Sequence, residues 1–115
     1  MRNTMLATAF LAKLANGEAV GFAEIDLRPY ADGCRSSPVG YLEAWYVVPE
    51  HRRKGIGQSL LRAAEVWARA HGCTEMASDT EVTNALSRRV HGALGYAEVS
   101  RLAHFRRDLS PRTEA

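Results

Sequence analysis

The most informative segment of this chain reads Tyr46-Val47-Val48-Pro49-Glu50-His51-Arg52-Arg53-Lys54-Gly55-Ile56-Gly57-Gln58-Ser59-Leu60-Leu61. A β-branched run ends at a proline, basic residues follow, and two glycines spaced Gly-x-Gly open an amphipathic helix. This order places several backbone N–H groups at a helix N-terminus, where unpaired donors and the helix dipole attract an anion. Glycine lets the main chain approach such a ligand and adopt a positive φ. The segment therefore predicts a strand, a basic turn and a helix that together bind a pyrophosphate.

Two common pyrophosphate motifs do not match this turn. A P-loop places its lysine directly after the second glycine, whereas Lys54 precedes the first one. A dinucleotide-binding fingerprint needs a third glycine at the position of Leu60. The remaining pattern is Arg-x-x-Gly-x-Gly at Arg52, Gly55 and Gly57, for which an ordinary basic turn before a surface helix is the alternative interpretation.

This pattern, directly after a strand, resembles the acetyl-CoA-binding motif of the GNAT N-acetyltransferase superfamily. Further segments resemble one branch of it, the aminoglycoside 6'-N-acetyltransferases: Asp32–Pro38 leading into Tyr41–Glu43, Glu75–Thr80 and Val90–Tyr96. The resemblance runs from about Thr8 to Arg107. Members of that branch begin with a strand and two helices before the segment that starts here near Leu6. We therefore expect a single GNAT-like domain over residues 1–115 that lacks this N-terminal β-α-α segment, with a flexible tail at 110–115.

The pattern of apolar residues and turn signals predicts strands followed by alternating helices and strands. Strands are expected at 6–14, 19–27, 41–48 and 75–78, helices at 56–71 and 83–94, and two closing strands near 96–100 and 103–109. The fold class is therefore α+β, GNAT-like, in the order β-β-β-α-β-α-β-β. A mixed, mostly antiparallel β-sheet is expected, flanked by helices.

Composition restricts the class of protein further. The 115 residues are 46% hydrophobic and 24% charged, as in one globular domain. No apolar run is long enough to span a membrane and no leader with a cleavage site is recognised, so we expect a cytoplasmic protein without a membrane partner. A net charge of +2 without a long basic run disfavours nucleic acid as a partner. Two widely separated cysteines favour reduced thiols over a disulfide or a metal site.

The resemblance implies acetyl-CoA as co-substrate, and the cysteine spacing gives no reason to expect a metal. The resemblance places the pantetheine arm and the acetyl carbonyl at the end of the third strand, with the Val47 N–H as oxyanion donor, and Asn84 against the pantetheine arm. The cofactor residues that it implies are Trp45, Tyr46, Val47, Arg52, Arg53, Lys54, Gly55, Ile56, Gly57, Gln58 and Asn84. Core packing is the alternative role of the Trp45 and Tyr46 side chains, and helix capping is that of Asn84.

Two carboxylates are the candidates for binding the acceptor amine. Glu43 is the one carboxylate in an otherwise apolar strand, so it needs a polar partner or a cleft. Strand alternation places it on the face of Trp45 and Val47. The resemblance makes Glu43 an acceptor-binding residue and candidate general base, and it brings Asp79 into contact with the reacting amine. The alternatives are a surface glutamate and a turn aspartate.

Two further residues complete the candidate site. His91 stands where many members of the superfamily have the tyrosine that protonates the departing thiolate, and its alternatives are a structural histidine with water as the acid. Tyr30 resembles an acceptor-contacting tyrosine, with an ordinary exposed loop tyrosine as the alternative. The candidate catalytic residues are thus Glu43, Asp79 and His91, and the candidate substrate-binding residues are Tyr30, Glu43 and Asp79.

The function expected from the resemblance is transfer of acetyl from acetyl-CoA to the 6'-amine of aminoglycosides, by direct attack of the amine on the thioester. Two alternatives stay open: a GNAT enzyme for another amine, such as a polyamine or a protein N-terminus, and a truncated, non-catalytic CoA-binding or dimerisation module. A sheet that lacks its N-terminal cover exposes an apolar face or edge, so we expect a homodimer.

Overall fold

The computed structural model describes residues 6–80, 85–101 and 103–111. The elements follow the expected order through the second helix. They are β1 (Ala7–Lys13), β2 (Ala19–Arg28), β3 (Val39–Val47), a short 3₁₀ helix (Pro49–His51), α1 (Ile56–Ala70), β4 (Met76–Ser78) and α2 (Ala85–Ala93). Within the described part of the chain, no helix has the length and apolar character needed to cross a lipid bilayer.

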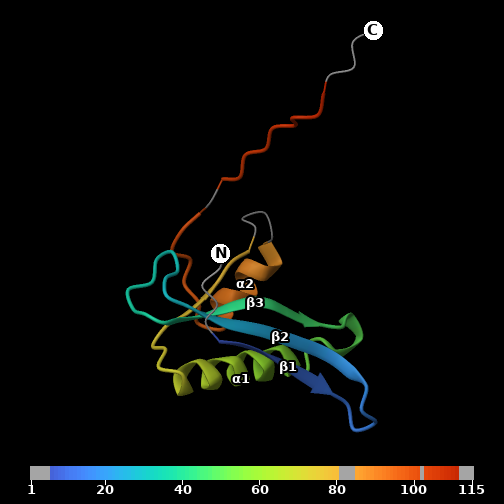
Figure 1. Cartoon of the computed structure of the whole chain (residues 1–115). Helices are drawn as coiled ribbons and strands as arrows, with labels where there is room; N and C mark the ends of the chain where they lie inside the picture. Colours follow the sequence, from blue (N-terminus) through green and yellow to red (C-terminus); the bar gives the residue numbers. More distant parts are fainter. Residues whose placement is uncertain (1–5, 81–84, 102, 112–115) are drawn as a thin grey trace.

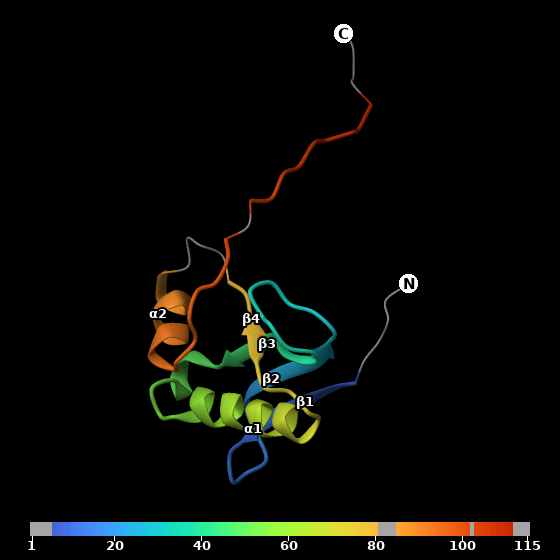
Figure 2. The same ribbon diagram turned by 90° about the vertical axis from the view of Figure 1, so that its left-hand side faces the viewer.

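The four strands form one sheet in the order β1-β2-β3-β4. β1, β2 and β3 pair antiparallel, and β4 joins β3 in parallel after the crossover through α1. Helix α1 runs along one face of this sheet, while α2 lies near β3 and β4 (Figure 1, Figure 2). The expected α+β fold with a mixed, mostly antiparallel sheet is confirmed.

The hydrophobic core lies between the sheet and α1. Its buried side chains come from alternate positions of β2, from β3, from one stripe of α1 and from the segment after α1, and they are Ala23, Ile25, Leu27, Leu42, Leu60, Leu61, Ala64, Ala68 and Cys73. β3 approaches α1 and β4 closely at Gly40, because a Cβ atom there would lie 2.6 Å from the Met76 sulfur and 2.8 Å from the Ala68 Cβ. Both cysteines are free thiols, as expected.

The pairing of β2 with β3 contains a β-bulge at the residue of greatest functional interest. Glu24 pairs with Ala44 and the next residue, Ile25, pairs with Leu42, so Glu43 is the extra residue of β3. A bulge of this kind disrupts the ladder locally and re-aims a side chain. The bulge thus sets where the Glu43 carboxylate points.

The bulge also corrects one prediction made from strand alternation. Leu42 belongs to the core under α1, and Trp45 and Val47 pack against that same core, although Leu42 and Trp45 are three positions apart. Glu43 instead contacts Arg28, whose strand position alternates with the core residues of β2. The prediction that Glu43 shares a face with Trp45 and Val47 is wrong, because the extra residue shifts the alternation by one.

The two closing strands predicted near 96–100 and 103–109 do not form. The described residues after α2 have no strand assignment, and those from 103 to 111 extend away from the body of the molecule (Figure 1). Alternating apolar residues indicate that a segment suits a strand, but a strand also needs a partner edge, and β4 offers three residues. Phe105 and Leu109 consequently remain 94% and 84% exposed. The predicted tail at 110–115 lies mostly outside the described residues.

Candidate functional site

β3 separates from its parallel neighbour in the middle of its length. Pairing of β3 with β4 ends at Leu42 and Ser78, whereas β3 itself continues to Val47. Along the described residues, the second half of β3 therefore has no β4 partner on that side. Backbone N–H and C=O groups left without a ladder partner need another one, and a ligand can supply it. This is the kind of splayed strand end at which the pantetheine arm was expected.

The turn between β3 and α1 contains two left-handed residues. Arg53 has φ 63°, and Gly55, which caps the N-terminus of α1, has φ 82°. A non-glycine residue in this region is uncommon and points to a constrained turn. Turns that contain left-handed residues can aim successive N–H groups into one concavity that attracts anions. A Cβ on Gly55 would meet nothing within 4 Å, so the space above the turn is open to a ligand.

Gly57 has a different role from Gly55. Its carbonyl accepts a hydrogen bond of 3.0 Å from the Trp45 indole N–H, and a Cβ on it would lie 3.4 Å from the Trp45 ring. The small residue lets the first turn of α1 pack on the end of β3. The Trp45 side chain thus packs against the core, so a cofactor contact at this position would come from its backbone. Tyr46 lies exposed on the other face, with its ring centroid 6.2 Å from that of Phe22.

The basic residues of the turn divide into one tether and two exposed charges. Arg52 donates from Nε to the Val47 carbonyl oxygen at 2.7 Å, and its guanidinium lies 5.4 Å from the centre of the Tyr46 ring. Arg52 therefore ties the turn to the end of β3. Arg53 and Lys54 are exposed, so their charges are available to an anion at the N-terminus of α1.

A shallow pocket between α1 and the end of α2 begins in the first turn of α1. It is lined by Gln58, Leu61, Arg62, Glu65, Ala93 and Leu94. The Tyr96 hydroxyl donates to Glu65 Oε2 at 2.8 Å and so joins the segment after α2 to α1. Burial and this hydrogen bond raise the pKa of Tyr96 well above its ordinary value, so the phenol remains a donor. The pocket thus lies between α1 and the end of α2.

His91 connects α2 to the end of β4. Its Nδ1 lies 2.8 Å from the Ser87 carbonyl oxygen, which can accept but cannot donate, so Nδ1 carries the proton. Its Nε2 lies 3.1 Å from the Ser78 hydroxyl. The imidazole also stands edge-on to the rings of Trp45 and Tyr96, each 5.9 Å away between centroids. His91 is thereby fixed beside the point where β3 and β4 separate.

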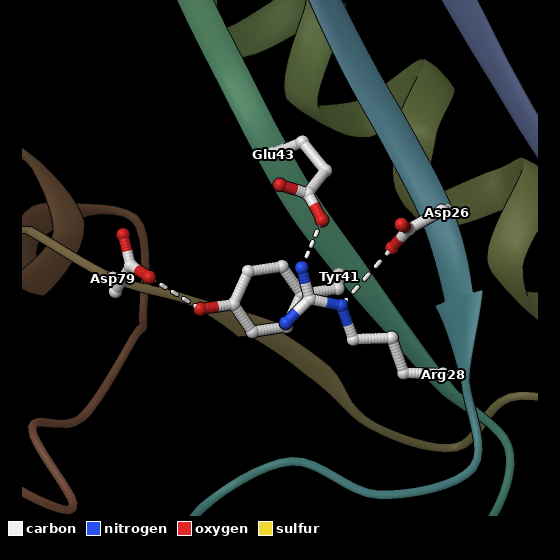
Figure 3. Close-up of polar contacts among 5 residues, drawn as sticks. All are labelled: Asp26, Arg28, Tyr41, Glu43 and Asp79. Carbon is white, nitrogen blue, oxygen red and sulfur yellow. Dashed lines mark hydrogen bonds and ion pairs between the residues drawn. The ribbon is translucent and has the colours of Figure 1, made fainter. Parts of the chain in front are cut away.

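The second half of the site is a cluster of charged residues on the sheet face opposite α1 (Figure 3). The Arg28 guanidinium donates to Glu43 Oε1 and its Nε lies 3.4 Å from Asp26 Oδ1. Asp26 is 4% exposed, whereas the side chains of Arg28 and Glu43 are each 35% exposed. Glu43 thus has the polar partner that an apolar strand requires. Burial alone would lower the pKa of Arg28, but the hydrogen bond to Glu43 and the nearby carboxylates raise it.

Tyr41 joins this cluster to Asp79. The Arg28 guanidinium carbon lies 3.5 Å from the centre of the Tyr41 ring, and the Tyr41 hydroxyl donates to Asp79 Oδ2 at 2.6 Å. Burial, followed by the hydrogen bond to Asp79, raises the pKa of Tyr41 to about 12. The structure therefore brings Glu43 and Asp79 into one network, through Arg28 and Tyr41 (Figure 3).

The candidate residue Tyr30 falls outside this network. Tyr30 is 67% exposed and donates to Asp32 Oδ1 at 3.0 Å, within its own loop. Glu75 anchors that loop to β4, because its Oε1 accepts hydrogen bonds from the Ser36 hydroxyl and from the backbone N–H groups of Arg35 and Ser36. The Ser36 hydroxyl, followed by the Arg35 N–H, lowers the pKa of Glu75. Asn84 lies outside the described residues.

Sequence reasoning missed Asp26, Arg28 and Tyr41 as members of the site. A signal was present in β2, where Glu24, Asp26 and Arg28 occupy every second position and alternate with core residues. Such alternation indicates a strand with one polar face. The gathering of Asp26 and Arg28 around Glu43 depends on the register of β2 against β3, which the alternation alone does not give.

Comparison with known proteins agrees with this arrangement. Residues 3–96 match the acetyltransferase (GNAT) family. An aminoglycoside N(6')-acetyltransferase type 1 from Klebsiella aerogenes is 52% identical over 103 residues, covering 90% of this chain and 68% of that protein. A protein of the same name from Stenotrophomonas maltophilia is 48% identical and covers 89% and 67%.

A solved structure extends the similarity to three dimensions. The structure of AAC(6')-Iy in complex with the bisubstrate analogue CoA-S-monomethyl-acetylneamine superimposes with a TM-score of 0.82 at 40% identity, covering 93% of this chain and 71% of that one. With the family match over most of its length and these relatives, the chain belongs to the GNAT acetyltransferase family, in the branch of the aminoglycoside 6'-N-acetyltransferases.

Proposed function

We propose that this chain transfers the acetyl group of acetyl-CoA to the 6'-amine of aminoglycosides. The observation that carries the proposal is the position of β3 (Val39–Val47) between two half-sites. Its end leads into the anion-binding turn, and its middle carries Tyr41 and Glu43 of the charged cluster. The names of the relatives and the bisubstrate complex of AAC(6')-Iy, in which CoA and neamine are joined, support this pairing of cofactor and acceptor.

The cofactor half of the proposal uses the turn and the splayed end of β3. The pyrophosphate would sit on the N-terminal N–H groups of α1, with Arg53 and Lys54 beside it. The acetyl carbonyl would accept a hydrogen bond from the Val47 N–H, which stabilises the charge that develops on its oxygen. The full proposed set is Trp45, Tyr46, Val47, Arg52, Arg53, Lys54, Gly55, Ile56, Gly57, Gln58 and Asn84.

The acceptor half of the proposal uses the carboxylates. Glu43 and Asp79 bind the ammonium group, with Tyr30 as an outer contact, and Glu43 accepts its proton directly or through a water molecule. The amine nitrogen then attacks the thioester carbon, the bond from that carbon to sulfur breaks, and the nitrogen gives up a second proton to water, so that acetyl remains on it as a neutral amide. No covalent enzyme intermediate forms. Proximity supplies much of the rate, because both reactants are held along one strand.

The departing thiolate needs one proton to become free CoA. We propose His91 or water as its source. In the observed arrangement the Nε2 of His91 accepts from Ser78, so His91 donates only after it has gained a second proton. Water is the donor when His91 is neutral.

We also propose that the protein is a homodimer and that it acts in the cytoplasm, where acetyl-CoA is available. Exposed apolar side chains support association: Leu11 and Tyr46 lie on the sheet face opposite α1, and Phe105 and Leu109 on the extended C-terminal segment. Light scattering at micromolar concentration tests the dimer. A strictly monomeric species would overturn it.

The proposed acceptor position is tested with a matched pair of aminoglycosides that differ only in an amine or a hydroxyl at the 6' carbon. The amine compound should gain one acetyl group by mass spectrometry, and the hydroxyl compound should gain none at that carbon. Equal acetylation of both would place the reaction at another amine.

A further inference from the structure

Arg28 is bound within the charged cluster in the way that proteins bind an organic cation. Its guanidinium donates to Glu43, lies 3.4 Å from Asp26 at Nε, and covers the Tyr41 ring with its carbon 3.5 Å from the ring centre (Figure 3). Carboxylates at the edge and an aromatic face beneath are the two features that favour a cation at one point. The same features would receive the ammonium group of an acceptor.

The cluster gathers carboxylates on one face of the sheet. Asp26 and Glu43 contact the Arg28 guanidinium, and Asp79 joins the cluster through the Tyr41 hydroxyl. An incoming ammonium is therefore attracted to the cluster. To reach Glu43, however, it must compete with the guanidinium that already donates to Oε1 of that residue.

We propose that Arg28 is an internal counter-cation of the acceptor site, which the acceptor's ammonium group displaces from Glu43 and from the Tyr41 ring. Arg28 then sets the affinity and the cation specificity of the site. This inference rests on the proposed function, because it takes the cluster to be the acceptor site. The inference goes beyond the proposed function by assigning a residue that competes with the substrate.

Displacement is physically feasible at this position. Arg28 is the last residue of β2, its side chain is 35% exposed, and a loop follows it. Its guanidinium can move away from Glu43 and from the Tyr41 ring without disturbing the ladder. An arginine does not lose its proton, so it leaves the site only by moving. Because a partly exposed ion pair stabilises a protein weakly, the cost of displacement should amount to about three- to tenfold in acceptor affinity.

The competition favours acceptors with several positive charges. A monoamine gains Glu43 but loses the interaction of Arg28 with the same carboxylate, so the exchange is nearly neutral. A polycation can place a second ammonium near Asp79, which remains tied to the Tyr41 hydroxyl. We therefore assign Arg28 the role of a residue that discriminates polycationic acceptors, such as aminoglycosides, from simple amines.

The test compares Arg28→Gln with Arg28→Lys and with Arg69→Gln, which removes an exposed charge from α1 on the other side of the sheet. Neamine binding is measured by calorimetry in the presence of CoA, and KM and kcat by thiol release. Arg28→Gln should bind neamine about three- to tenfold more tightly and lower KM by the same factor. Arg28→Lys and Arg69→Gln should keep the affinity of the parent protein, and all three should keep its CoA affinity.

Opposite results are informative. Unchanged or weaker neamine binding by a folded Arg28→Gln protein would overturn the inference while leaving the proposed function intact. Absence of neamine binding and turnover in the parent protein would overturn both. Should Arg28→Gln fail to fold, the Nε–H resonance of Arg28 in the parent protein decides the question: it should shift on saturation with neamine, and a constant resonance would overturn the proposal.

Discussion

The Tyr41 hydroxyl donates a 2.6 Å hydrogen bond to Asp79, so that β3 holds the residue that follows β4 at the point where the two strands separate. Tyr41 pairs with Ala77 in the parallel ladder, and Asp79 lies two residues further along. The contact fixes a carboxylate at the edge of the splay and joins it to the charged cluster. A replacement at either residue should therefore affect the acceptor more than the cofactor.

Tyr41→Phe tests the effect of this hydrogen bond on the pKa of the Tyr41 hydroxyl. Because burial and Asp79 raise the pKa of Tyr41 from 10.0 to about 12, the folded protein retains a proton that the unfolded chain releases in that window. The contribution of Tyr41 to the free energy of unfolding is thus complete below pH 10 and decreases as the pH rises toward 12. Urea unfolding below and above pH 10 should show this decrease in stability in the parent protein and not in the variant. In an absorbance titration, the parent protein should contain a tyrosine that ionises well above pH 10, and the variant should lack it. An unchanged titration would show that Tyr41 is not the shifted group.

Asp79→Asn should reduce turnover of aminoglycosides while leaving CoA affinity nearly unchanged. The amide keeps the shape and can still accept from Tyr41, but it removes the charge that attracts the ammonium. We expect kcat/KM to decrease by roughly a hundredfold. Steady-state kinetics gives this value, and calorimetry with CoA is the internal control. A variant as active as the parent would show that the acceptor does not use Asp79.

Gly55→Asp should abolish CoA binding. The substitution places a negative charge where the pyrophosphate is proposed to lie, and it also strains a residue with φ 82°. Gly72→Asp is the matched control, because Gly72 has φ 88°, an equally open surrounding, and a position after the opposite end of α1. Both variants should lose about 1–2 kcal/mol of stability, but only Gly55→Asp should lose CoA. Equal CoA affinity in the two variants would show that the turn is not part of the cofactor site.

Gly40→Ala should destabilise the fold by about 1–3 kcal/mol. Its new methyl group would meet the Met76 sulfur at 2.6 Å and the Ala68 Cβ at 2.8 Å, which forces α1 and β4 away from β3. Gly92→Ala, in α2 with nothing within 4 Å, is the control and should gain up to about 1 kcal/mol from helix propensity. Urea unfolding measures both. Equal stability of the two variants would contradict the close packing at Gly40.

Local patterns predicted most of the fold and one half of the site. The run from Tyr46 to Leu61 predicts the end of β3, the turn and the start of α1, because proline, glycine and apolar spacing act within a few residues. The positive φ of Gly55 agrees with that reasoning. The lone glutamate in β3 also indicated correctly that Glu43 needs a polar partner.

The remaining features depend on contacts between distant segments. The bulge at Glu43 is a property of the β2–β3 register, so strand alternation placed its side chain on the wrong face. Arg28 joins Glu43 across that same pairing, and Asp79 reaches Tyr41 only through the parallel pairing of β4. The closing strands were predicted near 96–100 and 103–109, but a strand also needs an edge on which to pair.

The central claim is that one chain holds acetyl-CoA at the turn after β3 and a polycationic amine beside Glu43 and Asp79. It is tested most directly by release of the CoA thiol when the purified 115-residue chain is mixed with acetyl-CoA and a panel of aminoglycosides and polyamines. The account predicts rapid thiol release with aminoglycosides that carry a 6'-amine and little with polyamines. Measurable CoA binding without turnover of any aminoglycoside would contradict it and would favour a module that binds the cofactor without catalysis.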